Sequence, residues 1–203
     1  IDITDGLAGR TPASVDEGVL MPETYYFTYG DDRGALIQRM RSALNETLDE
    51  LWPGRVEGLP IKTPEEALIL ASIIEKETGV AQERELVASV FINRLNRGMR
   101  LQSDPTVVYA VTDGSGPLGR SISKADLAID SPYNTYRNTG LPPGPIANPG
   151  RASIAAVLNP AESNYLYFVA DGKGGHAFAT TLAEHNRNVA RWRRLRSQQQ
   201  DNN

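Results

Sequence analysis

The strongest helix signal in the chain lies in residues 63–79, which read TPEEALILASIIEKETG. Thr63 stands at an N-cap position, Pro64 at the first helical position and Glu66 three residues after the cap, which is the pattern of a capping box. Gly79 is a natural stop at the other end. Because the residues between these signals are more apolar than those of any other predicted helix, we expect this helix to lie in the core.

Two more helices are predicted, one on each side of this segment. Asp31 or Asp32 can cap the first, in which apolar residues recur at helical spacing until Pro53 ends it. The second spans about residues 83–97 and ends at Gly98. The first half of the chain is therefore predicted to be mainly helical.

Residues 99–150 break this pattern. Asp104 and Ser123 look like caps of short helices, whereas residues 133–150 form a stretch rich in prolines and turns. A loop of that length in a compact domain is usually functional or disordered. Asn148, which precedes a proline, then looks like the start of another short helix.

The C-terminal part predicts a β-hairpin followed by a helix. Residues 165–169 and 176–179 are typical of strands, and the glycine-rich stretch 171–175 is typical of the turn between them. Thr181 and Glu184 form a second capping box, which opens the final helix. The predicted fold class is α+β, a helix-dominated domain with a small β-hairpin or sheet.

Composition and charge exclude several classes of protein. The chain has 203 residues, of which 40% are hydrophobic, and this suffices for the core of one domain. Its net charge of −4 argues against nucleic-acid binding, and the arginine-rich run in residues 187–196 is most simply a solvated helix face. The absence of cysteine excludes disulfides and thiolate metal sites. No apolar run approaches the length of about 18 residues needed to span a membrane.

Two glutamates, Glu75 and Glu77, stand near the end of the apolar helix. A carboxylate at the rim of a buried helix face is partly desolvated, which favours the neutral form that a general acid needs. The two side chains diverge by about 200° around the helix, so they do not form an acid–nucleophile pair by themselves. From spacing alone, a pair of surface glutamates with Lys76 between them remains the simpler interpretation.

Two polar clusters could bind a sugar. The first offers neutral hydrogen-bonding side chains, and the second combines aromatic faces with amide and hydroxyl groups. The candidate sugar-binding residues are Gln102, Ser103, Asp104, Tyr133, Asn134, Thr135 and Tyr136. The first cluster has a simpler alternative in an N-cap at Asp104, which precedes Pro105. The second has the alternative of a rigid, proline-rich surface loop.

The histidines His176 and His185 offer only a weak case for zinc, because no third ligand is matched to them. A structural or hydrogen-bonding role is the favoured interpretation, and no metal and no cofactor are predicted. The stretch 171–175 lacks the spacing of a phosphate-binding loop and is interpreted as a hairpin turn.

Several blocks, taken together, resemble the endolytic murein transglycosylase family, also called MltG or YceG-like proteins. The blocks are LASIIEKET (70–78), VASVFINRL (87–95), MRLQSDPTVVY (99–109), YNTY (133–136), GLPPG (140–144) and YLYFVADGKGGH (165–176). The match covers about residues 17–192 in the order of the family, and several long unrelated blocks make it highly specific.

The resemblance implies that Glu75, the first glutamate of the Glu-Lys-Glu motif, is the catalytic acid and base of a lytic transglycosylase. Such an enzyme cleaves the MurNAc–GlcNAc bond of peptidoglycan glycan strands and leaves 1,6-anhydro-MurNAc ends. Glu77 would then be a supporting or structural residue. A hydrolytic muramidase and a non-catalytic glycan-binding module remain the alternatives.

The resemblance also implies an organisation and a location. We expect a connecting segment in residues 1–16, a YceG-like catalytic domain in residues 17–196 and a disordered tail in residues 197–203. Family members carry an N-terminal transmembrane anchor and usually a LysM-like module, and neither is recognised in this chain, which begins at Ile1 and is interpreted as a fragment or processed form. We expect the parent protein at the periplasmic, extracytoplasmic face of the bacterial inner membrane, with glycan strands as substrate and cell-wall synthases as candidate partners.

Overall fold

The computed structural model describes residues 7–8 and 15–201, and its centre is the helix α2 (Pro64–Glu77). The Thr63 hydroxyl caps α2 by accepting a hydrogen bond from the Glu66 N–H at 3.2 Å, as predicted. The Glu66 carboxylate accepts from the N–H of Lys62 instead of that of Thr63, so only half of the predicted capping box forms. The prediction of a core helix is confirmed, because six of its residues are buried.

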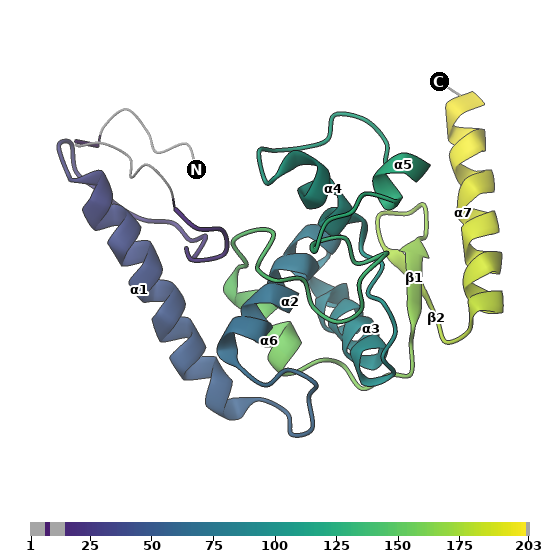
Figure 1. Ribbon diagram of the computed structural model, residues 1–203, viewed down its shortest axis with the longest axis horizontal. Coiled ribbons are helices and arrows are strands. Elements are labelled where there is room, and N and C mark those ends of the chain that lie inside the picture. The colour runs from purple at the N-terminus through teal and green to yellow at the C-terminus, as the bar shows by residue number, and fades with distance from the viewer. Residues whose placement is uncertain (1–6, 9–14, 202–203) are drawn as a thin grey trace.

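Two shorter helices pack against α2 and complete the main core (Figure 1). One is α3 (Arg84–Asn96), which follows the 3₁₀ turn η2 (Ala81–Glu83). The other is α6 (Arg151–Leu158), which contacts both α2 and α3. The side chain of Phe91 on α3 is only 1% exposed in this core. This three-helix arrangement fixes the end of α2, where both glutamates lie.

The long helix α1 (Arg33–Leu51) runs along one side of the molecule and ends in the 3₁₀ turn η1 (Trp52–Gly54) (Figure 1). Asp32 is its N-cap and accepts from the Ala35 N–H at 3.0 Å, which confirms one of the two predicted caps. The N-terminal half of α1 packs in a second apolar cluster with Leu7 and other buried residues. Its C-terminal half joins the main core.

The loop region contains α4 (Asp104–Thr112) and α5 (Lys124–Leu127). Ser123 caps α5, as predicted, and the structure shows that it forms a full capping box with Asp126. The N-cap of α4 is Ser103, so the interpretation of Asp104 as a cap was wrong. The helix expected to start at Asn148 begins at Arg151, because the Asn148 side chain accepts instead from the backbone N–H of Leu20 at 3.0 Å.

The predicted hairpin is formed by antiparallel β1 (Tyr167–Ala170) and β2 (His176–Ala179). Its turn is built as expected, with the Asp171 carboxylate accepting from two backbone N–H groups within the turn. β1 starts two residues later than the predicted strand. The reason is that the Asn93 amide on α3 binds the carbonyls of the residues before β1, including that of Tyr165 at 3.0 Å.

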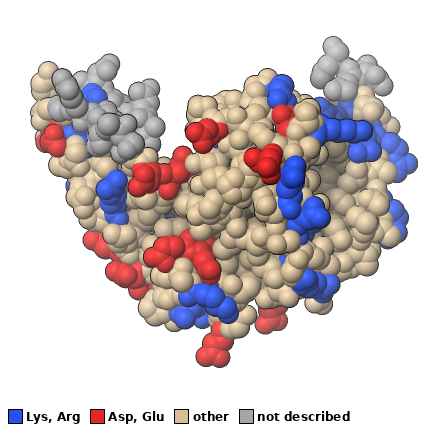
Figure 2. All heavy atoms as spheres, viewed as in Figure 1, with Lys and Arg blue, Asp and Glu red and all other residues tan. Residues whose placement is uncertain are grey.

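The last helix, α7 (Leu182–Asp201), packs beside the hairpin at the opposite side of the molecule from α1 (Figure 1). Its arginines in residues 187–196 are exposed, and Figure 2 shows basic side chains gathered over this side, as expected for a solvated face. Residues 197–201, predicted as part of a disordered tail, continue α7 because no glycine or proline interrupts it. Residues 202–203 and most of the predicted connecting segment 1–16 lie outside the described residues. The α+β fold class is confirmed, and no helix in the described part of the chain is long and apolar enough to cross a membrane.

Candidate functional site

Glu75 links the end of α2 to the start of α6. Its Oε2 accepts a hydrogen bond from the Gly150 N–H at 3.1 Å and another from the Ser153 hydroxyl at 2.6 Å. The carboxylate therefore sits at the N-terminal end of α6, where the helix dipole favours negative charge. The side chain is half-buried and does not point into open solvent.

Glu77 lies two residues further on and faces a different set of groups. Its Oε1 accepts a hydrogen bond from the Ser103 hydroxyl at 2.5 Å. Burial raises the pKa of Glu77 to about 7, and the nearby Asp104 charge adds to the rise, against the opposing effects of Ser103 and Arg94. A carboxyl group with a pKa near neutrality can both donate and accept a proton at physiological pH.

The segment that contacts Glu77 begins with a strained residue. Gln102 is exposed and has a left-handed φ of 50°, which is unusual for a residue with a side chain. Its backbone N–H donates to the Thr135 carbonyl at 3.1 Å, and the next N–H, from Ser103, donates to the Thr135 hydroxyl at 3.0 Å. Strained residues of this kind persist where the surroundings fix them, and they cluster at functional sites.

Asp104 and Tyr136 form the outer part of the same site. The Tyr136 hydroxyl donates to the Asp104 carboxylate at 2.6 Å. Burial and this hydrogen bond raise the pKa of Tyr136, and the charge of Glu77 raises it further. Asp104 is exposed, so this pair borders both Glu77 and the solvent from which a substrate would enter.

The other predicted sugar-binding residues are used inside the protein. Asn134 is fully buried; its amide donates to the carbonyls of Leu127 and Ile129, and its Oδ1 accepts from the Tyr136 N–H. Thr135 is 1% exposed. These positions do not agree with the prediction that Asn134 and Thr135 contact a sugar directly, because their polar groups are already satisfied.

The structure thus divides the predicted site residues into groups. Those that lie around Glu77 are Gln102, Ser103, Asp104 and Tyr136. Tyr133 packs its ring against Tyr109, with 4.7 Å between the centroids. Glu75, also on α2, bonds instead to Gly150 and Ser153 at the start of α6.

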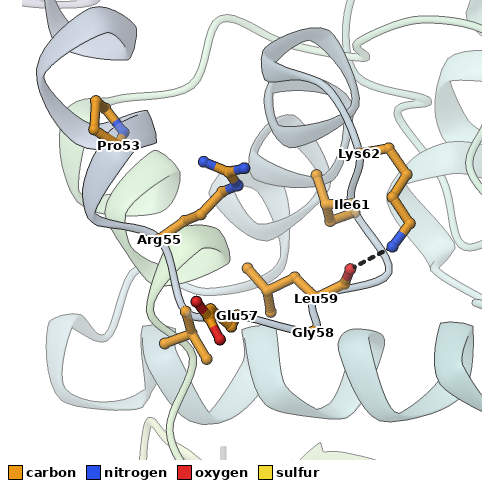
Figure 3. A pocket seen from close by; sticks show the side chains of 8 residues that line it. Pro53, Arg55, Glu57, Gly58, Leu59, Ile61 and Lys62 are labelled. Carbon is orange, nitrogen blue, oxygen red and sulfur yellow. Dashed lines mark hydrogen bonds between the residues drawn. The ribbon is translucent and has the colours of Figure 1, made fainter.

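A surface hollow of about 520 Å³ lies in the loop between α1 and α2 (Figure 3). Arg55, Leu59 and Lys62 are among its lining residues, and the Lys62 ammonium donates to the Leu59 carbonyl. The hollow is next to the first turn of α2, which places it roughly 20 Å along the helix from Glu77. It is therefore separate from the candidate site.

The histidines have structural contacts, in agreement with the favoured interpretation. His176 donates its backbone N–H to Glu83 at 2.9 Å, and its Nδ1 lies 2.7 Å from the other carboxylate oxygen, which ties the hairpin to the turn η2. His185 stacks on Tyr167 with 5.2 Å between ring centroids. Among the residues that the structure describes, no cluster of three potential metal ligands occurs.

The sequence model of the YceG-like family matches residues 3–191. The chain belongs to the YceG-like family. Its curated relatives include the endolytic murein transglycosylases of Bacillus subtilis (strain 168), 42% identical over 84% of this chain, and of Streptococcus pneumoniae (strain ATCC BAA-255 / R6), 41% identical over 86%. The chain spans 46% and 32% of the length of these two relatives, respectively.

A solved structure agrees with this YceG-like assignment. The crystal structure of a YceG-like protein from Listeria monocytogenes is 43% identical to this chain and superposes with a TM-score of 0.70. The match covers 84% of this chain and 54% of the other. The family and the fold of this YceG-like chain are therefore established together.

Sequence reasoning missed one residue of the site, Arg94. It lies three residues after Phe91 and four after Val90, so it shares a helix face with these two apolar residues. An arginine on an apolar face was the available signal. In the structure Arg94 is 7% exposed and affects the pKa of Glu77.

Proposed function

We propose that this YceG-like chain is the catalytic part of an endolytic murein transglycosylase. It would cleave the MurNAc–GlcNAc bond of peptidoglycan strands and leave 1,6-anhydro-MurNAc ends. Family membership and the names of the relatives support the substrate class. The observation that carries the chemistry is Glu77, a half-buried carboxyl group with a pKa of about 7 beside the exposed polar residues Gln102 and Asp104.

The proposed reaction needs one carboxyl group and no water. Protonated Glu77 donates its proton to the glycosidic oxygen, and the bond from that oxygen to C1 of MurNAc breaks. The positive charge at C1 is relieved by the acetamido group of the same sugar, a form of substrate assistance. The Glu77 carboxylate then takes the proton of the C6 hydroxyl while the C6 oxygen attacks C1. This attack closes the anhydro ring, and the proton restores the acid form of Glu77. An intramolecular attack has a high effective concentration.

The geometry favours Glu77 over Glu75 as the acid. Glu77 lies beside Ser103 and Asp104, two of the residues expected to hold a sugar, and burial has brought its pKa into the range where it can serve first as acid and then as base. Glu75 accepts two hydrogen bonds that fasten α2 to α6. The assignment of Glu75 from family resemblance stays a prediction, and a pair of substitutions distinguishes the two.

The test compares Glu75→Gln with Glu77→Gln on glycan strands from purified sacculi. Glutamine keeps the shape of each side chain but cannot donate the proton. We expect Glu77→Gln to lower turnover by about a hundredfold or more, and Glu75→Gln to keep most of the activity. The opposite result would assign the acid to Glu75.

Mass spectrometry of the products separates the remaining functions. Anhydro ends support a transglycosylase, whereas products heavier by one water, with reducing ends, indicate a muramidase. Binding of glycan without any product indicates a glycan-binding module. Wild-type protein serves as the reference in each case.

The family also suggests a cellular setting. We propose that the parent protein is anchored to the inner membrane with this domain on the extracytoplasmic face, where its glycan substrate lies. A cell-wall synthase is the partner we propose. Protease accessibility in intact spheroplasts tests the side of the membrane, and co-purification with synthases tests the partner.

A further inference from the structure

Arg94 is a charged residue on the buried side of α3. Its guanidinium donates from Nε to the Leu166 carbonyl at 2.6 Å and from Nη1 to the Leu101 carbonyl at 2.7 Å. It also lies over the ring of Tyr167, 5.1 Å from the centroid. Burial lowers the pKa of Arg94, yet an arginine keeps its proton under all conditions in which proteins fold. The core beside Glu77 therefore contains a permanent positive charge.

In the described part of the chain, no carboxylate contacts this charge directly. Among the side chains that the structure describes, in residues 7–8 and 15–198, no carboxylate oxygen lies at ion-pairing distance from the Arg94 guanidinium. Arg94 and Glu77 are nevertheless close enough for each to shift the pKa of the other. The other charged or titratable groups that act on Glu77 or respond to it are Asp104 and Tyr136. Arg94 is the positive group in this set, so it favours the ionised form of Glu77.

Arg94 also holds the loop that contacts Glu77. The Leu101 carbonyl that it binds lies two residues before Ser103, whose hydroxyl donates to Glu77 Oε1 at 2.5 Å. Gln102 lies between them with its left-handed φ. Because such a conformation is kept only when neighbours fix it, the guanidinium that fixes one side of Gln102 helps to set the position of Ser103.

We propose that Arg94 is a positioning residue for Glu77, which fixes the loop carrying Ser103 and supplies a buried positive charge near the carboxylate. The consequence for catalysis rests on the proposed function, whereas the electrostatic coupling does not. When Glu77 gives its proton to the glycosidic oxygen, a negative charge remains in a half-buried site. Arg94 stabilises that charge until the carboxylate takes the proton of the C6 hydroxyl.

The test uses Arg94→Gln, which removes the charge, and Arg94→Lys, which keeps the charge but lacks the planar group that reaches two carbonyls. Arg97→Gln is the matched control, because Arg97 is exposed at the end of the same helix and its charge is screened by solvent. The pKa of Glu77 is measured by ¹³C NMR of labelled glutamate carboxyl groups, with Glu77→Gln to assign the signal. We expect it to rise by about one unit in Arg94→Gln and to stay within about half a unit in the other two variants.

An unchanged Glu77 pKa in folded Arg94→Gln would overturn the electrostatic part. Should Arg94→Gln fail to fold, Arg94→Lys decides the positioning part. In Arg94→Lys we expect glycan turnover to fall about tenfold or more with little change in KM. Turnover equal to wild type would overturn the positioning role of Arg94. If wild-type protein cleaves no glycan at any pH while the NMR titrations behave as expected, the proposed function fails and the coupling between Arg94 and Glu77 stands.

Discussion

The carboxylate of Asp104 adds to the effect of burial on Glu77, because a second negative charge opposes its ionisation. Asp104→Asn keeps the size of the side chain and an acceptor for the Tyr136 hydroxyl, but removes the charge. The pKa of Glu77 should then fall below about 7 by roughly half a unit to one unit. We expect the high-pH limb of the kcat/KM profile on glycan strands to move to lower pH by the same amount.

Tyr136→Phe is the control for this substitution. It removes the hydrogen bond at 2.6 Å but leaves Asp104 charged, so the profile should move much less than in Asp104→Asn. A profile that stays in place in Asp104→Asn while KM rises severalfold would contradict the electrostatic role. It would instead support direct sugar binding by Asp104, as the sequence predicted.

Among the structural elements, the loop between α5 and α6 depends on the buried side chain of Asn134. Its amide satisfies the carbonyls of Leu127 and Ile129 and the N–H of Tyr136, and each would lose its partner in Asn134→Ala. Since unsatisfied buried groups are costly, we expect the free energy of unfolding to fall by about 2–4 kcal/mol, measured by urea denaturation.

Asn138→Ala is the matched substitution in the same loop. Asn138 also donates to two carbonyls, but it is exposed and water can replace the lost bonds, so a loss below about 1 kcal/mol is expected. If Asn134→Ala kept full stability and raised KM instead, Asn134 would be a sugar ligand after all.

The helices could be predicted from the sequence because their signals are local. Asp32, Thr63 and Ser123 cap the helices that follow them, and each cap bonds to a backbone N–H only three residues away. The conformation of the loop between α3 and α6 could not be predicted in this way, because it depends on hydrogen bonds to residues far away in the sequence. The N–H of Ile146 in this loop, for example, donates to the Ser72 hydroxyl on α2, 74 positions away in the chain.

The same limit applies to the two glutamates. The helical period shows that Glu75 and Glu77 point in different directions, but not what either of them meets. Glu77 meets Ser103, 26 positions away, whereas Glu75 meets Ser153, 78 positions away. Only the packing of α4 and α6 around α2 distinguishes the two carboxyl groups.

For the molecule as a whole, several ionisable groups make its stability depend on pH in opposite directions. Glu77 has a folded pKa of about 7 against an ordinary value of 4.5, so the folded state holds this proton more tightly and stability falls as pH rises through that interval. Burial lowers the pKa of His185 from 6.5, so this group makes stability fall as pH drops below that value. Hydrogen bonds from Arg120 and Ser123 lower the pKa of Asp126 below its ordinary 3.8. The stability that this carboxylate contributes is therefore lost only as the pH falls below 3.8.

Comparison of wild type with Glu77→Gln isolates the first of these contributions, because His185 and Asp126 are common to both proteins. At pH 8 the wild type must bury a carboxylate at position 77 and the variant a neutral amide, whereas at pH 4 both side chains are neutral. We therefore expect the variant to gain roughly 2–3 kcal/mol of stability over wild type between about pH 4 and pH 8. Urea denaturation at each pH, followed by circular dichroism, measures the difference. A difference that stays constant with pH would mean that the Glu77 carboxyl has an ordinary pKa, and the same side chain would then be ionised at neutral pH and unable to protonate a leaving sugar.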